Sequence, residues 1–516
     1  MTHTFRLATA ASLSCVLAGA LLASTPAGLS AAGASCEDLR QMTIGGGRID
    51  SAQIVSAGLF VPPNARNGGA NPFSKLPAFC RVTATLTPST DSDIKVEVWL
   101  PSSDWNAKLQ AVGNGGWGGT IGYPALASAL GKGYAAVGTD TGHSTEGASF
   151  ALDHPEKFID YAYRSEHEMT VTAKAVIEHF YGSGPKLSYF NGCSTGGRQA
   201  LVEASRYPDD FDGIIAGAAA NPKAHLDAWR ISMAQTMHAS IESFIPPSKD
   251  ATIHEAVLAK CDALDGAKDG LIENPRQCRF DPGALLCTGA DTPSCLTSAQ
   301  VKTARVVMSP VKNPKTGELV FPTYEPGTEL GWGRLLGGPE AYDTAVDQYK
   351  YVVFNDARWD WRTFDLERDM AKGNAAAKGV LAAVSPNLTA FARRGGKLIT
   401  YHGWSDPNVA PQASVNFYKS ALAATQPPAS SPEWLRLFMV PGMGHCSGGA
   451  GPDTFDMVSA LEAWVEKGVA PNQVLASRIV DGAVVRSRPL CPYPQVARYK
   501  GTGSLDEAVN FSCVSP

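Results

Sequence analysis

The residues with the clearest chemical potential lie in the segment 191–197, which reads Asn-Gly-Cys-Ser-Thr-Gly-Gly. This segment contains Gly-x-Ser-x-Gly, follows a short apolar run and precedes a helical pattern at 198–206. In a strand–turn–helix setting, Gly192 and Gly196 permit a tight turn that exposes the serine at the carboxyl end of a sheet. The amide of Thr195, at the start of the helix, would point at a developing oxyanion. Ser194 is therefore predicted to be a nucleophile.

A serine hydroxyl needs a histidine to accept its proton and an acid to orient that histidine. Two later apolar runs end in such residues: 397–401 leads to Asp406, and 435–440 leads to His445. The order Ser, Asp, His, with each residue after its own strand, is that of α/β-hydrolases. Ser194, Asp406 and His445 are therefore predicted to form a catalytic triad.

Other acid and histidine residues compete for these roles. Asp140 and His143 follow another strand pattern, but His143 precedes the serine, so their loop is interpreted either as a rim that contacts substrate or as a structural turn. His402 lies near Asp406 in the sequence and is a second competitor.

A second oxyanion donor is expected from the glycine-rich segment 111–119, which follows an early strand pattern. Gly115 or Gly116 is the candidate. A phosphate-binding loop is the alternative, but the Lys-Ser/Thr ending of a P-loop is absent, and no suitable helix and acid follow the glycines as in a dinucleotide site.

Cysteines flank two of the predicted catalytic residues: Cys193 precedes Ser194, and Cys446 follows His445. A disulfide holds its two Cα atoms about 5.5 to 6 Å apart, so a bridge here would fix the serine and histidine loops close together. The alternative is that Cys193 is only a small buried residue in the turn.

The elements that must position these residues suggest an α/β class, because short apolar strand patterns alternate with helical ones. The expected strands are 95–100, 109–113, 134–138, 187–190, 213–216, 397–401 and 435–440. From Asn221 to about Pro386 the alternation fades and four cysteines cluster. We expect a catalytic domain formed by 36–222 and 387–516, with 223–386 inserted as a separate lobe.

Composition excludes several classes of protein. The chain has 516 residues, of which 44% are hydrophobic and 18% charged, which is unlike a disordered chain or a polytopic membrane protein. Lys and Arg number 44 against 49 Asp and Glu, and no basic block occurs. Neither nucleic acid nor an anionic membrane is therefore expected as a partner.

The first 35 residues are predicted to be a secretory signal peptide, because Arg6 precedes an uncharged, apolar stretch that ends in small residues. An uncleaved anchor is the alternative. Removal of this segment, which contains Cys15, leaves ten cysteines in a secreted or periplasmic protein, enough for five disulfides. Cys261/Cys278, Cys287/Cys295 and Cys491/Cys513 are close enough in sequence to close local loops, but arithmetic alone does not choose the pairing. The alternative to disulfides is that the cysteines bind zinc, although no Cys-x-x-Cys or His-x3-His spacing occurs.

The chain resembles the tannase and feruloyl esterase family, which includes hydrolases of mono(2-hydroxyethyl) terephthalate. The resemblance rests on Cys193-Ser194, Asp406 and His445-Cys446, with support from the segments 207–213 and 488–494. It implies an α/β-hydrolase core with a large inserted lid domain that supplies most of the substrate pocket. It also implies the disulfides Cys193/Cys446, Cys36/Cys80, Cys261/Cys278, Cys287/Cys295 and Cys491/Cys513.

The same resemblance implies a structural calcium ion in the lid. Its ligands would be the side chains of Asp262, Asp265 and Asp269 and the carbonyls of Ala267 and Leu271, all hard oxygen atoms that suit calcium. The spacing differs from that of an EF-hand, so the alternative is an aspartate-rich turn.

The resulting prediction is a serine esterase that hydrolyses small-molecule aromatic-acid esters of feruloyl, galloyl or terephthaloyl type through an acyl-enzyme. Trp404, two residues from the predicted acid, and Trp117, in the glycine segment, are the candidate substrate contacts. A serine peptidase or acyltransferase on the same fold is one alternative, and a non-catalytic protein that binds phenolic compounds is another. The sequence leaves the oligomeric state open.

Overall fold

The structure is a computed structural model that describes residues 33–63, 71–336, 338–377, 379–381, 384–426 and 431–516. The predicted signal peptide lies outside the described residues except for its last three positions. Within the described ranges, no helix is both long and apolar enough to cross a membrane.

A nine-stranded mixed sheet forms the centre of the described chain, in the order β1-β2-β3-β5-β4-β6-β7-β10-β11. Its strands are β1 (Gly47–Val55), β2 (Phe79–Leu86), β3 (Ile94–Pro101), β4 (Lys108–Val112), β5 (Ala135–Thr139), β6 (Leu187–Cys193), β7 (Gly213–Gly217), β10 (Lys397–Gly403) and β11 (Leu435–Val440). From β5 to β11 all neighbours are parallel, whereas β1, β2, β3 and β5 pair in antiparallel fashion. The α/β class predicted from the sequence is therefore confirmed.

All seven predicted strands are present, with ends that differ by at most three residues. Residues 135–139 and 213–217 are buried along their whole length, because strands in a parallel sheet are covered on both faces. The sequence analysis missed β1 and β2. The mostly polar sequence of β1 and its largely exposed residues give no apolar run to detect.

Helices cover both faces of the sheet. On one face α3 (Ser165–Tyr181), α4 (Thr195–Arg206) and α12 (Gln412–Ala424) share a hydrophobic cluster with the strands. On the other face α1 (Tyr123–Gly131) and α14 (Met457–Lys467) contribute to a second cluster. In α14 the buried residues Met457, Val458, Leu461 and Trp464 recur at helical spacing, and Asp456 caps the first turn by accepting a hydrogen bond from the Ser459 amide.

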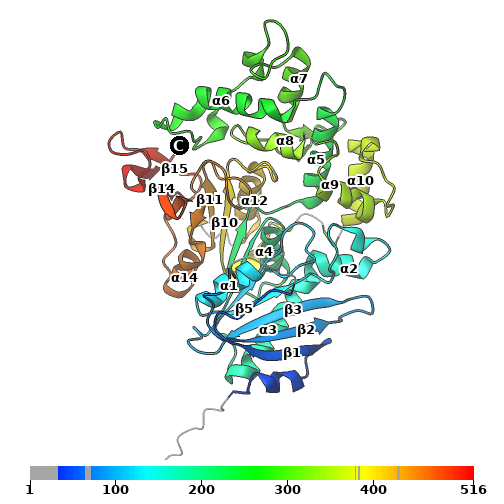
Figure 1. Cartoon of the computed structure of the whole chain (residues 1–516), viewed down its shortest axis with the longest axis vertical. Helices are drawn as coiled ribbons and strands as arrows, with labels where there is room; N and C mark the ends of the chain where they lie inside the picture. Colours follow the sequence, from blue (N-terminus) through cyan, green and yellow to red (C-terminus); the bar gives the residue numbers. More distant parts are fainter. Residues whose placement is uncertain (1–32, 64–70, 337, 378, 382–383, 427–430) are drawn as a thin grey trace, which may run out of the picture.

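Between β7 and β10 the chain leaves the sheet, and residues 223–386 of this stretch are called the insertion below. Its helices are α5 (Lys223–Met237), α6 (Asp250–Cys261), α7 (Ser298–Val307), α8 (Trp332–Leu335), α9 (Asp343–Asp347) and α10 (Leu366–Ala377), and its hairpin is formed by β8 (Val311–Lys312) and β9 (Leu319–Phe321). These elements pack around their own hydrophobic cluster, which also includes Val409, Ala410 and Ala413 after β10. Figure 1 shows α6, α7 and α8 at the opposite end of the molecule from β1, β2 and β3.

Short elements complete the described chain. They are α2 (Pro155–Ile159), α11 (Thr389–Arg393), α13 (Ser431–Trp434), a small sheet of β12 (Thr454–Phe455), β13 (Val474–Val480) and β14 (Ala483–Leu490), and the pair β15 (Val496–Tyr499) and β16 (Phe511–Val514). Five disulfides join Cys36 to Cys80, Cys193 to Cys446, Cys261 to Cys278, Cys287 to Cys295 and Cys491 to Cys513. These are the five pairs that the family resemblance implies.

Candidate active site

Ser194 occupies the sharp turn between β6 and α4. Its backbone has φ 64° and ψ −119°, a conformation that non-glycine residues rarely adopt. A Cβ atom at position 192 would lie 2.5 Å from the carbonyl oxygen of Gly196, so glycine is required there for the turn to close. The turn is held by the Ser194 amide, which donates to the carbonyl of Gly217 on β7 over 2.9 Å.

The three residues predicted to form the triad are in hydrogen-bond contact. The Nε2 atom of His445 lies 2.8 Å from the hydroxyl oxygen of Ser194. The Nδ1 atom of the same ring lies 2.7 Å from Oδ2 of Asp406. These distances allow a proton to pass from the hydroxyl to the imidazole while the carboxylate fixes the orientation of the ring.

Asp406 is fully buried and held from several directions. Its Oδ1 atom accepts hydrogen bonds from the amides of Asn408 and Val409 over 2.7 and 3.0 Å, and its Oδ2 atom is shared by His445 and by His402, whose Nε2 lies 3.0 Å away. Burial opposes the charge of the carboxylate, but the charge of His445 and the hydrogen bonds from the two histidines outweigh it and hold the pKa of Asp406 well below its usual range. The competitor His402 thus contacts the acid but not the serine.

The insertion is linked to Asp406 through the peptide group between Asn408 and Val409. Arg230 on α5 donates from Nε and Nη2 to the carbonyl oxygen of Asn408 over 3.1 and 2.6 Å. The amide of Val409, which belongs to the same peptide group, donates to Asp406. The peptide dipole therefore lies between a guanidinium and a carboxylate, an arrangement in which each hydrogen bond strengthens the other.

A disulfide joins the two loops that carry Ser194 and His445. Cys193 and Cys446 are 253 residues apart in sequence, and their Cα atoms are 6.0 Å apart. Cys446 has a positive φ of 64°. The bridge fixes the serine and histidine turns next to each other, as expected from the cysteines beside the motif residues.

Backbone groups for an oxyanion lie beside the serine. Thr195 is the first residue of α4, so its N–H has no acceptor within the helix. Gly115 and Gly116 line the same cavity as Ser194. The carbonyl of Gly116 accepts hydrogen bonds from the hydroxyls of Thr195 and Tyr161 over 2.6 and 3.2 Å, which anchors the glycine loop.

The cavity around Ser194 and His445 has a volume of about 420 Å³. The insertion supplies part of its wall. Sequence analysis missed several side chains that line it, among them Lys223, Arg230, Tyr342, Thr344 and Asn408. No sequence motif marks these residues, because their approach to the cavity depends on how the insertion packs on the sheet.

Neither candidate tryptophan lines this cavity. Trp404 is only 4% exposed and packs in the hydrophobic cluster on the α3, α4 and α12 face of the sheet, so the prediction that it contacts substrate is corrected here. Trp117 lies behind the wall, where its ring centroid is 4.1 Å from Nζ of Lys223 and its indole N–H donates to the carbonyl of Thr344.

The loop that contains Asp140 and His143 supports the glycine segment. The Nε2 atom of His143 lies 2.7 Å from the carbonyl oxygen of Trp117, and its ring stacks on Phe150. Burial lowers the pKa of His143 to about 4 and raises the pKa of Asp140 to about 7. Of the two interpretations left open by the sequence, the structural turn matches these contacts.

The loop for which calcium is predicted contains the five expected ligand residues, although the carboxylate oxygens of its three aspartates do not all lie within 4.8 Å of one another. Burial, with a smaller contribution from the charges of Asp269 and Asp262, raises the pKa of Asp265 to about 6, and Arg488 pairs with Asp269. Ala267 and Leu271 are buried, yet in the part of the chain that the structure describes their carbonyl oxygens accept no hydrogen bond. Buried carbonyls normally have a partner, so these residues fit a hard cation with oxygen ligands.

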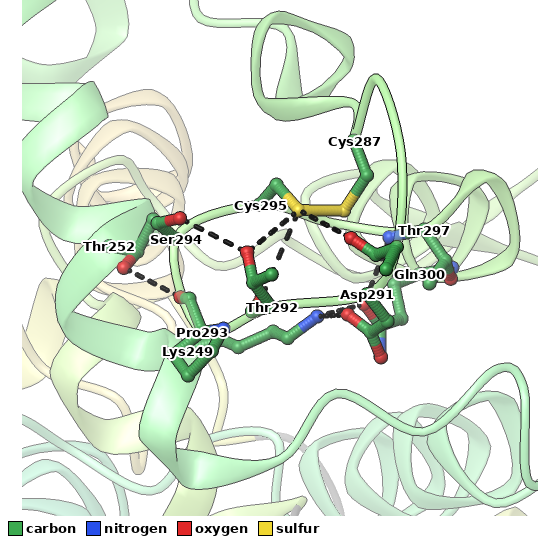
Figure 2. Close-up of a disulfide and its surroundings, with 11 residues drawn as sticks. Lys249, Thr252, Cys287, Asp291, Thr292, Pro293, Ser294, Cys295, Thr297 and Gln300 are labelled. Atoms are coloured by element: carbon green, nitrogen blue, oxygen red, sulfur yellow. Dashed lines mark hydrogen bonds and ion pairs between the residues drawn. A yellow bond between two sulfur atoms is a disulfide. The ribbon is translucent and has the colours of Figure 1, made fainter.

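A second cluster has its possible ligand atoms close enough together for a metal ion, but two of its three residues form a disulfide. Cys287, Asp291 and Cys295 are the group within the described ranges whose ligand atoms all lie within 4.8 Å of one another. Figure 2 shows that the two sulfur atoms are bonded to each other and that Asp291 is paired with Lys249. Because a disulfide offers no thiolate, this cluster braces a loop and is not a metal site.

Comparison with known proteins agrees with this geometry. The model of the family Tannase and feruloyl esterase matches residues 80–514. An esterase of Xanthomonas campestris pv. campestris is 37% identical over 94% of this chain and 92% of that protein. The crystal structure of feruloyl esterase B from Aspergillus oryzae superimposes with a TM-score of 0.87 at 33% identity and covers 93% of this chain and 99% of that one.

A tannin acyl hydrolase from Aspergillus niger has the same fold, with a TM-score of 0.73 at 22% identity over 94% of both chains. The fold is thus of the α/β-hydrolase type, as predicted. The family match covers most of the chain, and the identity with the bacterial esterase extends over nearly its whole length. This chain is a carboxylic ester hydrolase that belongs to the tannase and feruloyl esterase family.

Proposed function

We propose that this protein hydrolyses esters of aromatic acids through a Ser194–His445–Asp406 triad. The observation that carries the proposal is the continuous hydrogen-bond path from the hydroxyl of Ser194 through His445 to the buried Asp406, over 2.8 and 2.7 Å. The names of relatives, a feruloyl esterase and a tannin acyl hydrolase, support an aromatic acyl group. Feruloyl, galloyl and terephthaloyl esters are the proposed substrate types.

The reaction proceeds in two halves. In the first, the hydroxyl oxygen of Ser194 attacks the ester carbonyl while His445 accepts the hydroxyl proton, and the amides of Thr195 and of Gly115 or Gly116 stabilise the oxyanion. Collapse of this intermediate breaks the ester C–O bond, and His445 returns the proton to the departing alcohol. In the second half, a water molecule that gives its proton to His445 attacks the acyl-enzyme and releases the aromatic acid.

The triad is tested with methyl ferulate, methyl gallate and a peptide anilide, assayed with the wild type and with Ser194→Ala. We expect hydrolysis of the aromatic esters to fall by at least about 10⁴-fold in the variant. A serine-directed fluorophosphonate should label the wild type at residue 194. Absence of labelling would indicate a binding protein, and cleavage of the anilide alone would indicate a peptidase.

Calcium is proposed as a structural ion of the insertion. Asp262, Asp265 and Asp269, with the carbonyls of Ala267 and Leu271, would hold it, and the buried carbonyls without hydrogen bonds support this assignment. The ion would stabilise the loop and would take no part in the reaction, because none of these residues lines the catalytic cavity.

A secreted or periplasmic location is proposed as well. Five disulfides in one chain support it, because such bonds form and persist in oxidising compartments. Cell fractionation followed by thiol labelling tests the location: the protein should be found outside the cytosol with its ten paired cysteines unreactive.

A further inference from the structure

Among the described residues that line the catalytic cavity, two have cationic side chains and none has a carboxylate. These two are Lys223 and Arg230. Both cations lie on α5 and are less than one-tenth exposed. Buried charges are costly unless they are paired, so the balance of charge at this wall determines what ligand it accepts.

The carboxylate of Asp227, which does not line the cavity, forms salt bridges with both cations. Asp227, which is fully buried, lies 2.5 Å from Nζ of Lys223 through Oδ2 and 3.1 Å from Nη1 of Arg230 through Oδ1. The three residues therefore carry one positive charge in excess. Burial lowers the pKa of Lys223 despite the attraction of Asp227, and the charges of Arg230 and the more distant Arg198 add to this effect.

The hydrogen-bond donors of the two cations are used differently. Arg230 directs Nε and Nη2 at the carbonyl of Asn408 and Nη1 at Asp227, so it holds the acid loop. The ammonium of Lys223 has three N–H groups. One donates to Asp227, and the face of the Trp117 ring lies 4.1 Å from the nitrogen. A further N–H of Lys223 has no acceptor within the described part of the chain.

We propose that Lys223 binds an anionic oxygen on the acyl part of the substrate, either a carboxylate or an ionised phenol. This inference rests on the proposed function and narrows its substrate class. The acyl part is assigned because Lys223 is only 2% exposed, whereas the alcohol leaves first and must be replaced by water. An anion would offset the excess positive charge and accept the remaining N–H, which makes the wall selective for acidic aromatic acids.

Binding to the wild type tests the charge directly and needs no turnover. Terephthalate and 4-methylbenzoate differ at one end only, where the first has a carboxylate and the second a methyl group. We expect calorimetry at pH 7 to show terephthalate binding about 10- to 100-fold more tightly, the range for a hydrogen bond between charged groups. Equal affinity, or tighter binding of 4-methylbenzoate, would overturn the proposal.

Variants test whether Lys223 causes the difference in affinity between terephthalate and 4-methylbenzoate. In Lys223→Met the ratio of the two affinities should fall to about one, while Lys223→Arg should keep most of it. Lys302→Met, an exposed lysine on α7, is the matched control and should keep the wild-type ratio. A ratio between two ligands is insensitive to the fraction of folded protein. An unchanged ratio in Lys223→Met would overturn the assignment.

Measurements of hydrolysis distinguish a failure of this inference from a failure of the proposed function. Loss of hydrolysis for all aromatic esters would refute the proposed function, whereas the affinity ratio would still decide the role of Lys223. For active enzyme, monomethyl terephthalate should exceed dimethyl terephthalate in kcat/KM throughout pH 5–8. If a phenolate is the ligand, the advantage in kcat/KM of methyl 4-hydroxycinnamate over its 4-methoxy analogue should rise with pH as the phenol ionises and fall again where Lys223 loses its proton. A higher kcat/KM for monomethyl than for dimethyl terephthalate, with no difference between the two cinnamates, identifies a carboxylate as the ligand. A higher kcat/KM for the hydroxycinnamate than for its methoxy analogue identifies a phenolate.

Discussion

The catalytic turns and the insertion are built by different means, although each contains a disulfide. Cys193 and Cys446 are 253 residues apart and join two turns at the ends of parallel strands, next to Ser194 and His445. Cys287 and Cys295 are 8 residues apart and close a local loop of the insertion (Figure 2). The comparison indicates that the first bond orients reacting groups, whereas the second restricts only its own loop.

The sharpest test of this comparison removes each disulfide in turn. In Cys193→Ala/Cys446→Ala we expect kcat on methyl ferulate to fall by about 100-fold, because a displacement of about 1 Å between nucleophile and base has an effect of that size. Cys287→Ala/Cys295→Ala should keep kcat within about twofold. Steady-state kinetics with circular dichroism as the folding control measures both, and equal losses would contradict the distinction.

Chelation of calcium should affect the insertion and spare the chemistry. If the ion binds as proposed, EGTA should remove about 2.7 kcal/mol from the free energy of unfolding measured at a calcium concentration one hundred times Kd. Metal analysis should detect about one calcium per chain, and Asp265→Asn should reduce it. A melting curve unaffected by EGTA, with no bound metal, would count against the ion.

Arg230 connects the two regions, and its removal should act on kcat. In Arg230→Met the carbonyl of Asn408 loses both donors, so Asp406 is held less firmly, and we expect kcat to fall by about 10-fold. KM for a neutral ester should change much less, which distinguishes a positioning residue from one that only stabilises the fold. Arg358→Met, at an exposed site of the insertion, should have no effect. A loss confined to KM would refute the positioning role.

The smallest expected effect concerns Glu325 in the insertion. Its carboxylate is buried and forms no hydrogen bond or salt bridge among the described residues, and burial, opposed by the charge of Arg276, raises its pKa from the usual 4.5 to about 7. The folded state therefore holds a proton that the unfolded state releases, so between pH 4.5 and 7 the stability of the wild type falls as pH rises.

Glu325→Gln removes this dependence. From pH 6 to pH 7, the free energy of unfolding of the variant should therefore rise by about 1 kcal/mol relative to that of the wild type. Denaturant unfolding at the two pH values measures it. Glu318→Gln, an exposed residue of the same hairpin region, should show no such gain. An equal effect of pH on the wild type and Glu325→Gln would contradict the assignment.

The sequence was sufficient to predict the parallel strands and the contact between Ser194, Asp406 and His445. Parallel strands are recognisable as short apolar runs, and a residue directly after such a run lies at the sheet's carboxyl edge. Ser194, Asp406 and His445 could be placed on these grounds because strand order brings the ends of β6, β10 and β11 together.

The cavity wall could not be predicted in this way. Lys223 and Arg230 reach the cavity only through the packing of α5, which depends on contacts distant in sequence. Proximity in sequence was also misleading for Trp404, since a turn directs residues two positions apart to different sides. The strand β1 has no apolar run and is held by pairing with β2.

The positions of the triad residues along the chain have a consequence for biosynthesis. Ser194 follows β6, but His445 follows β11, and the whole insertion is translated between them. A nascent chain that ends before β11 carries Ser194 without a proton acceptor. If the triad acts as proposed, the newly made polypeptide therefore gains hydrolytic competence only after the insertion and β11 have both been translated.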